Sequence, residues 1–113
     1  MRPINKYRAF YDFERTDPGY RPVEERLQDW REVEEHLTDA ELARQAARCM
    51  DCGIPFCYGA GCPLKNPIPE MNAAALDGRW EEAIQILQTT CPYPEITGRI
   101  CPALCEGSCC DAA

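Results

Sequence analysis

The sequence predicts a small, mainly α domain whose cysteine-rich loops are held by something besides apolar packing. With 113 residues the chain has room for one small domain, which buries a smaller share of its surface than a larger one does. Apolar residues recur at helical spacing in several segments, and no segment alternates convincingly at period two, so we expect no sheet. Nine cysteines in so short a chain indicate either disulfides or bound metal.

The composition changes near Cys49. Nine of the twelve basic residues precede it, whereas all nine cysteines and seven of the ten prolines lie at or after it. We therefore predict a polar N-terminal helical segment over residues 1–48 and a cysteine-rich segment over residues 49–113. The two segments are expected to form one domain.

Two helices are predicted in the first segment. Residues 22–36 form a charged helix with an apolar stripe at three- and four-residue spacing: Val23, Leu27, Trp30 and Val33. The next helix begins with a capping box between Thr38 and Glu41, and a hydrophobic staple is predicted between Leu37 and Leu42. It runs to about Arg48 and delivers the first cysteine at a defined place.

Shorter helices are predicted between and after the cysteine groups. Glu70 to Leu76 follows Pro67 and Pro69 and ends before Gly78. Trp80 to Gln88 forms another helix, with Trp80, Ala83, Ile84 and Leu87 on one face. A last helical turn begins at Pro102 and ends at Gly107.

Charge and hydropathy narrow the function classes. The amino terminus carries charges every few residues, and no stretch is apolar enough for a signal peptide or a membrane span. A reducing cytoplasm is therefore the expected location, where clustered cysteines bind metal or do redox chemistry more often than they form disulfides. The net charge of -7 argues against nucleic-acid binding and favours ordinary solubility.

The cysteine spacing indicates two iron-sulfur clusters. The first group reads Cys49-x2-Cys52-x4-Cys57-x4-Cys62-Pro63, and in ferredoxins a comparable run holds one cluster with three cysteines while the fourth binds another. The second group, Cys101-x3-Cys105-x3-Cys109, is too sparse for a cluster of its own but completes two sites begun by the first. Nearby glycines (Gly53, Gly59, Gly61) and prolines (Pro55, Pro63, Pro102) are expected to bend the backbone around the clusters.

Two other uses of the cysteines fit less well. Zinc is the structural alternative, because Cys49-x2-Cys52 is half of a zinc knuckle, but no second such pair occurs and no histidine follows His36. A thioredoxin-like motif needs a strand before it and a helix after it, whereas here the predicted helix comes first. His36 itself is expected to be a surface residue without a catalytic role.

Four motifs in order resemble the small chain of NADPH-dependent glutamate synthase: RPVEERLQDWREV, QAARCMDCGIPFC, GCPLKNPIPEMN and PEITGRICPALCEGSC. The resemblance covers about residues 20 to 109 and extends to the front domains of dihydropyrimidine dehydrogenase and of electron-bifurcating ferredoxin:NADP oxidoreductases. It implies a helical fold with two [4Fe-4S] clusters whose ligands are interleaved between the two cysteine groups.

The resemblance also implies which residues bind each cluster. Cluster one would be held by Cys49, Cys52, Cys57 and Cys109, and cluster two by Cys62, Cys101 and Cys105. The eighth ligand of the family is a glutamate or glutamine well beyond the last shared cysteine, and the sequence printed here stops at Ala113. Cys91 and Cys110 lie outside the family pattern and are expected to be spare thiols, with Cys110 a weaker candidate for the missing ligand.

In the resembling family the chain continues into a flavin domain and an NADPH domain, each with a Gly-x-Gly-x-x-Gly loop. Neither loop occurs in these 113 residues, so this chain alone is expected not to bind FAD or oxidise NADPH. The function implied is electron relay from NADPH and FAD toward the large chain, where glutamine and 2-oxoglutarate become glutamate. The alternatives are a metal-stapled module that docks the large chain, and the equivalent domain of another NAD(P)H-dependent flavoprotein.

Overall fold

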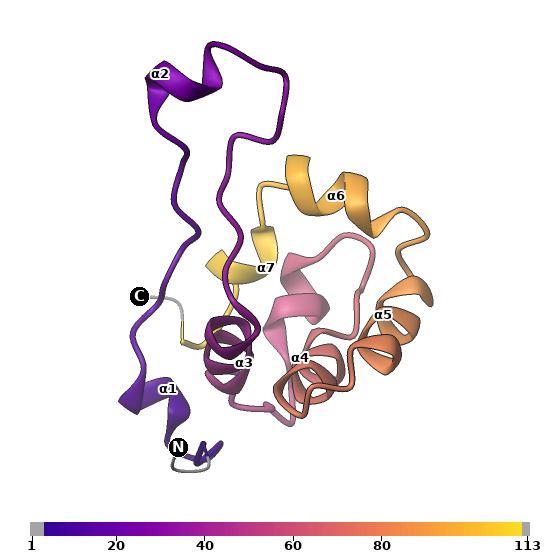
Figure 1. Ribbon diagram of the computed structural model, residues 1–113. Coiled ribbons are helices and arrows are strands. Elements are labelled where there is room, and N and C mark those ends of the chain that lie inside the picture. Colours follow the sequence, from indigo (N-terminus) through magenta and orange to yellow (C-terminus); the bar gives the residue numbers. More distant parts are fainter. Residues whose placement is uncertain (1–3, 112–113) are drawn as a thin grey trace.

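The computed structural model describes residues 4–111, which form a helical body and one long arm (Figure 1). Within these residues there is no β-strand, and one isolated antiparallel bridge joins Tyr20 to Glu34. The predicted mainly α class is confirmed. No helix in this part of the chain has the length and hydropathy to cross a membrane. The elements are α1 (Ala9–Asp12), α2 (Val23–Arg26), α3 (Asp39–Ala47), the π-helix η1 (Cys57–Gly61), α4 (Ile68–Leu76), α5 (Trp80–Gln88), α6 (Pro94–Ile100) and α7 (Leu104–Gly107).

The helical body is held together by small side chains. Helix α4 packs against both α3 and α5, α7 packs against η1, and α1 contacts α3. Among the described residues, the buried ones are Ala9, Ala46, Ala47, Gly61, Cys62, Pro69, Ala74, Ala83 and Cys91. Alanine allows helices to approach closely, but each one removes little apolar surface from water. The body therefore gains little stability from apolar burial, as the sequence predicted.

Three predicted helices are confirmed. Helix α3 starts with the capping box, in which the Glu41 amide donates to Thr38 Oγ1 at 3.3 Å and the Thr38 amide donates to Glu41 Oε2 at 2.8 Å. Helix α5 has the predicted bounds, and α4 begins two residues earlier than expected, with Pro69 in its first turn. Gly78 follows α4 at a φ of +71°, a left-handed conformation that glycine adopts without strain.

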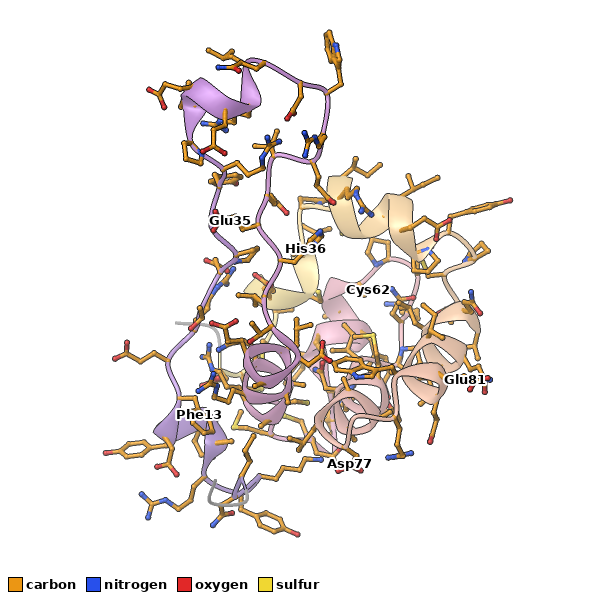
Figure 2. The ribbon with its side chains drawn as sticks, in the orientation of Figure 1. Phe13, Glu35, His36, Cys62, Asp77 and Glu81 are labelled. Atoms are coloured by element: carbon orange, nitrogen blue, oxygen red, sulfur yellow. The ribbon has the colours of Figure 1, made fainter. Side chains whose placement is uncertain are left out.

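The predicted helix over residues 22–36 is wrong beyond Arg26. This region belongs to the arm, defined here as residues 14–36, which leaves the body and returns to it (Figure 2 shows Glu35 and His36 on the arm and Cys62 in the body). Asp29 pairs with Arg21 and accepts from the Arg31 amide, a local bonding pattern that competes with helix formation. A short amphipathic helix is also marginal without a surface to pack on.

Some elements were not predicted or start elsewhere. Helix α6 begins with Pro94 at a favoured first-turn position, a signal present in the sequence. Helix α7 starts at Leu104 and not at Pro102, because Ala103 has a φ of +53° and a right-handed helix cannot include that conformation. The short α1 and the π-helix η1 have no clear sequence signal.

Candidate iron-sulfur site

A cavity of about 870 Å³ lies between α3, η1, α4 and the C-terminal segment. Eight of the nine cysteines line it: Cys49, Cys52, Cys57, Cys62, Cys101, Cys105, Cys109 and Cys110. All seven predicted ligand residues are therefore brought to one place by the fold. Within residues 4–111, no three cysteine, histidine or acidic side chains lie close enough to hold a single metal ion. The thiols instead surround a volume much larger than one ion.

The first cysteine group is positioned by the end of α3 and by η1. Cys49 directly follows the α3 cap, and its amide donates to the Ala46 carbonyl at 3.2 Å. Cys57 opens the π-helix and Cys62 closes it, through a hydrogen bond of 2.7 Å from the Cys62 amide to the Cys57 carbonyl. This i to i+5 bond brings the peptide groups of two cysteines together across the x4 spacing. Short π-turns are frequent at functional sites.

The second group is carried by the ends of α6 and α7. Cys101 caps α6, Cys105 lies within α7, and Cys109 follows it, with its amide donating to the Glu106 carbonyl at 3.0 Å. Ala103, in its left-handed conformation, redirects the chain between α6 and α7. The three cysteines thus reach the cavity from two short helices and not from one face of a single helix.

Gly61 is the point where the two groups meet. A Cβ atom at Gly61 would lie 2.8 Å from the Leu104 carbonyl oxygen, 2.9 Å from the Cys105 Cα and 2.7 Å from Ser108 Oγ. Only a residue without a side chain allows η1 and α7 to approach this closely. The other two glycines singled out by the sequence, Gly53 and Gly59, have open space at the same position. Of the three glycines, only Gly61 is required by a close approach.

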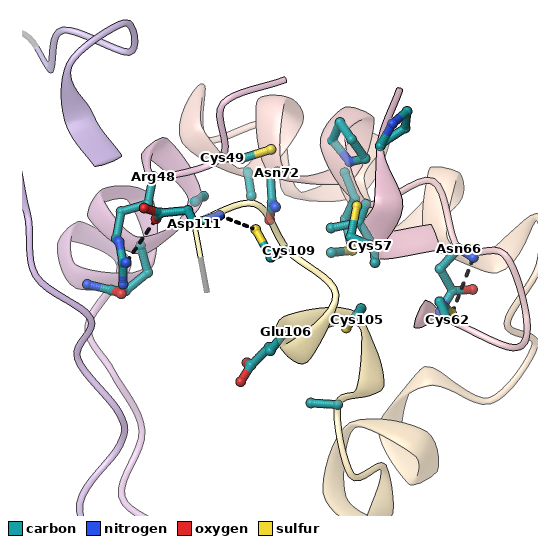
Figure 3. Close-up of a pocket in the computed structure, with 18 of the residues that line it drawn as sticks. Arg48, Cys49, Cys57, Cys62, Asn66, Asn72, Cys105, Glu106, Cys109 and Asp111 are labelled. Atoms are coloured by element: carbon teal, nitrogen blue, oxygen red, sulfur yellow. Dashed lines mark hydrogen bonds and ion pairs between the residues drawn. The ribbon is translucent and has the colours of Figure 1, made fainter. Parts of the chain in front are cut away.

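A salt bridge fastens the end of the second group to α3. Arg48 Nη2 lies 2.9 Å from Asp111 Oδ2, and both side chains are mostly buried (Figure 3). Because Arg48 precedes Cys49 and Asp111 follows Cys109 by two residues, this pair holds the two cysteines at the same edge of the cavity. The sequence carries no signal for this contact, which joins residues 63 positions apart.

The thiols that line the cavity influence one another's ionisation. Burial raises the pKa of the Cys57 thiol, and the nearby Cys49, Cys109 and Cys105 thiols raise it further because adjacent negative charges repel. Burial likewise raises the pKa of Cys105, and the Cys62 thiol and then the Glu106 carboxylate raise it further. Cluster binding requires thiolates, so these environments favour ligand deprotonation only when a compensating positive charge is present.

Backbone amides point at three of the sulfurs. The Asn66 amide donates to Cys62 Sγ at 3.5 Å, the Ala103 amide to Cys101 Sγ at 3.4 Å, and the Asp111 amide to Cys109 Sγ at 3.4 Å; the first and last of these bonds are drawn in Figure 3. Hydrogen bonds to ligand sulfur raise the reduction potential of iron-sulfur clusters and orient the ligands. The cavity therefore offers soft donors that already carry outer hydrogen bonds, a donor set that fits an iron-sulfur cluster.

The remaining polar candidates have separate environments. Cys91 does not line the cavity; it is 1% exposed, and its sulfur lies 3.1 Å from Thr97 Oγ1. Cys110 lies beside Cys52, whose pKa is raised by burial and then by this neighbour. Cys110 is thus near a residue assigned to cluster one. His36 is exposed and lies 3.2 Å from Glu32, which confirms its predicted surface position.

Comparison with known proteins agrees with this chemistry. Residues 26–113 match the family described as dihydropyrimidine dehydrogenase domain II, 4Fe-4S cluster. The glutamate synthase [NADPH] small chain of Mycobacterium tuberculosis is 55% identical over 92 residues, which are 81% of this chain and 19% of the relative. The small chain of Bacillus subtilis is 44% identical over 94% of this chain and 23% of its own length. The glutamate synthase [NADH] of Schizosaccharomyces pombe is 44% identical over 95% of this chain and 5% of its own length.

The chain thus spans about a fifth of the length of the small chains it matches. Its family match covers both cysteine groups and the helices between them. The chain therefore belongs to the dihydropyrimidine dehydrogenase domain II, 4Fe-4S cluster family, and its similarity to glutamate synthase small chains confirms the resemblance predicted from the four motifs.

Proposed function

We propose that this chain is the electron-relay domain of a glutamate synthase and that it holds two [4Fe-4S] clusters. The observation that carries this proposal is the convergence of thiols from both cysteine groups on one cavity of about 870 Å³. The arrangement supports interleaved ligation, in which each cluster takes ligands from both groups. It also supports a role for residues 1–48 and 49–113 as one domain, since Arg48 and Asp111 link the two segments.

We divide the ligands between the two clusters by which thiols influence one another most. We assign Cys49, Cys52, Cys57 and Cys109 to cluster one; Cys49 and Cys109 raise the pKa of Cys57 more than Cys105 does, which supports this set. We assign Cys62, Cys101 and Cys105 to cluster two, and the proximity of Cys105 to Cys62 supports that pair. The eighth ligand in this proposal is a glutamate or glutamine beyond the last shared cysteine, with Cys110 as the weaker alternative.

The protein supplies the geometry and the electrostatics of the relay. A bound [4Fe-4S] cluster accepts and releases single electrons, and the chemistry resides in the cluster. The cysteine thiolates hold each cluster. The Asn66, Ala103 and Asp111 amides donate hydrogen bonds to ligand sulfurs, which stabilises negative charge on the sulfurs and so favours the reduced cluster. The Arg48–Asp111 salt bridge fixes the backbone at the Cys49 edge, and its two charges balance each other.

The similarity to glutamate synthase [NADPH] small chains supports a route for the electrons. We propose that NADPH reduces FAD in the downstream domains of the complete enzyme, that electrons pass through the clusters to the large chain, and that glutamate forms there from glutamine and 2-oxoglutarate. In this proposal the flavin and nicotinamide chemistry belongs to those domains and not to residues 1–113. A cytoplasmic location suits this role, because a reducing compartment keeps the cysteines available as ligands.

Anaerobic reconstitution with iron and sulfide tests the proposal. We expect about eight irons and eight sulfides per chain if both clusters form, and about four if only the complete cysteine set of cluster one is loaded. Dithionite reduction should produce a paramagnetic resonance signal, with spin coupling when both clusters are present. Bound zinc without sulfide would overturn the relay in favour of a structural metal site.

Serine variants test the assignment of ligands. Cys49→Ser should remove the signal of cluster one, whereas Cys62→Ser should remove cluster two and leave cluster one reducible. Cys91→Ser is the matched control, because this thiol lies away from the cavity. A Cys62 variant with an unchanged iron content would contradict the assignment.

A further inference from the structure

The arm places large apolar side chains in solvent on an ordered tip. Trp30 is fully exposed, Leu27 is 80% exposed and Val23 is half-exposed. Val23 and Leu27 lie one helical turn apart at α2, and Trp30 follows three residues later. We call these three residues the tip patch. Tryptophan is enriched among the residues that dominate binding energy at protein interfaces.

The tip is held in one conformation by polar contacts and not by apolar packing. Arg21 makes two hydrogen bonds to the Asp29 carboxylate, at 2.7 and 3.0 Å, and donates to the Glu32 carbonyl at 3.1 Å. The outgoing and returning segments of the arm are joined by hydrogen bonds from the Arg21 amide to the Val33 carbonyl and from the Glu35 amide to the Gly19 carbonyl. A pre-ordered apolar patch loses little conformational entropy when it binds a partner.

The arm is also braced against the body. Arg15 Nη1 lies 2.8 Å from Glu106 Oε2, and Arg99 Nε of α6 lies 2.8 Å from Glu32 Oε1. Residues 15–18 at the base of the arm line the same cavity as the cysteines. The base of the arm therefore lies at the cavity, and its tip at α2 projects away from the body (Figure 1).

The charge of the arm identifies the chemistry of its partner. Residues 14–36 contain eight acidic and four basic residues, a net charge of −4. Among the residues that the structure describes, the carboxylates of Glu24, Glu25, Glu34 and Glu35 form no salt bridge. A negatively charged arm with an exposed apolar tip complements an apolar pocket that lies on a basic surface.

We propose that the arm is a docking anchor: the tip patch inserts into an apolar pocket rimmed by lysine and arginine on the large chain of the complex. This inference rests on the proposed function, because it takes the large chain as the partner. It assigns the anchoring role to a segment that contains none of the cysteines. Docking and electron relay therefore depend on different residues.

The test measures binding of the whole reconstituted chain to the large chain from the same organism by biolayer interferometry. Trp30→Ala should weaken binding about 30-fold, the effect of losing a central interface residue. Tyr7→Ala is the control, because this aromatic side chain is 90% exposed but lies outside the arm. Iron content and circular dichroism of both variants should equal those of the parent chain.

A charge-reversal variant tests the basic rim. Glu24→Lys combined with Glu25→Lys should slow association and reduce its dependence on salt, whereas Glu81→Lys on α5 should change neither. Equal binding by the Trp30→Ala and parent chains would overturn the proposal. So would a dimer of this chain that the Trp30 variant loses, because the tip patch would then bind a second copy.

The outcomes separate this inference from the proposed function. Binding that depends on Trp30 in a chain that forms no cluster would keep the anchor and remove the relay. Two reducible clusters in a chain whose binding ignores Trp30 would keep the relay and remove the anchor.

Discussion

Replacement of Gly61 by alanine tests how the two cysteine groups are joined. The added Cβ would lie 2.9 Å from the Cys105 Cα and 2.8 Å from the Leu104 carbonyl oxygen. Carbon atoms in good contact are about 3.5–4.0 Å apart, so α7 must retreat from η1 by roughly 0.6–1 Å. Both obstructing groups are backbone, which cannot rotate away. We expect a loss of about 1–3 kcal/mol in the free energy of unfolding, the usual cost of overpacking.

The same movement should affect cluster two more than cluster one, because it separates Cys105 from Cys62. The measurements are urea unfolding of the chain under reducing, anaerobic conditions and iron content after reconstitution. Gly59→Ala is the matched control, since it lies in the same π-helix with open space at its Cβ position. Equal stability and iron content in the two alanine variants would refute the proposed close packing of η1 and α7.

Three further predictions concern charge. Burial raises the pKa of Cys52, Cys57 and Cys105, so the folded cluster-free chain binds protons at these thiols more tightly than the unfolded chain does. This contribution to stability should be complete below the unfolded thiol pKa of about 8.5 and should be lost as pH rises through the higher folded pKa values. Urea unfolding measured from pH 7 to 10 tests this, and a free energy of unfolding that rises with pH would contradict it. Asp29 has a pKa of about 2, lowered mainly by its hydrogen bonds with Arg21, so the contribution of this pair is present above about pH 4 and is lost as pH falls toward 2. Asp29→Asn should loosen the arm and speed tryptic cleavage after Arg26 and Arg31 without lowering iron content, and unchanged cleavage would argue against the pair as the lock of the tip. Arg48→Gln and Asp111→Asn should each lower the free energy of unfolding of the cluster-free chain. Because the two groups interact, the loss in the double variant should be smaller than the sum of the two single losses. Strictly additive losses would show that the salt bridge contributes nothing.

The helices next to the cysteines could be predicted because their signals are local. The capping box of Thr38 and Glu41 satisfies amides at the start of α3 whatever lies around it. Gly78 ends α4 because its left-handed backbone conformation is accessible to glycine in any context. The apolar spacing from Trp80 to Gln88 has the helical period, and α5 occupies those residues.

The same kind of local reasoning failed in the arm. The stripe of Val23, Leu27, Trp30 and Val33 has helical spacing, but helical stability in proteins comes mostly from packing against another surface. No such surface faces this stripe within the described residues, and the Arg21–Asp29 pair stabilises a different backbone. The pattern that predicted a packed helix marks an exposed patch.

The sequence by itself determined the chemistry of the site, because residue type and spacing along the chain decide which atoms can bind a soft metal cluster. Seven cysteines in two groups were sufficient to predict that the groups converge, and the fold brings them to one cavity. Only the tertiary structure decided how they converge. The contact of Gly61 with α7 and the salt bridge from Arg48 to Asp111 join residues far apart in the sequence, and such contacts depend on the folded arrangement of the whole chain and not on any local pattern.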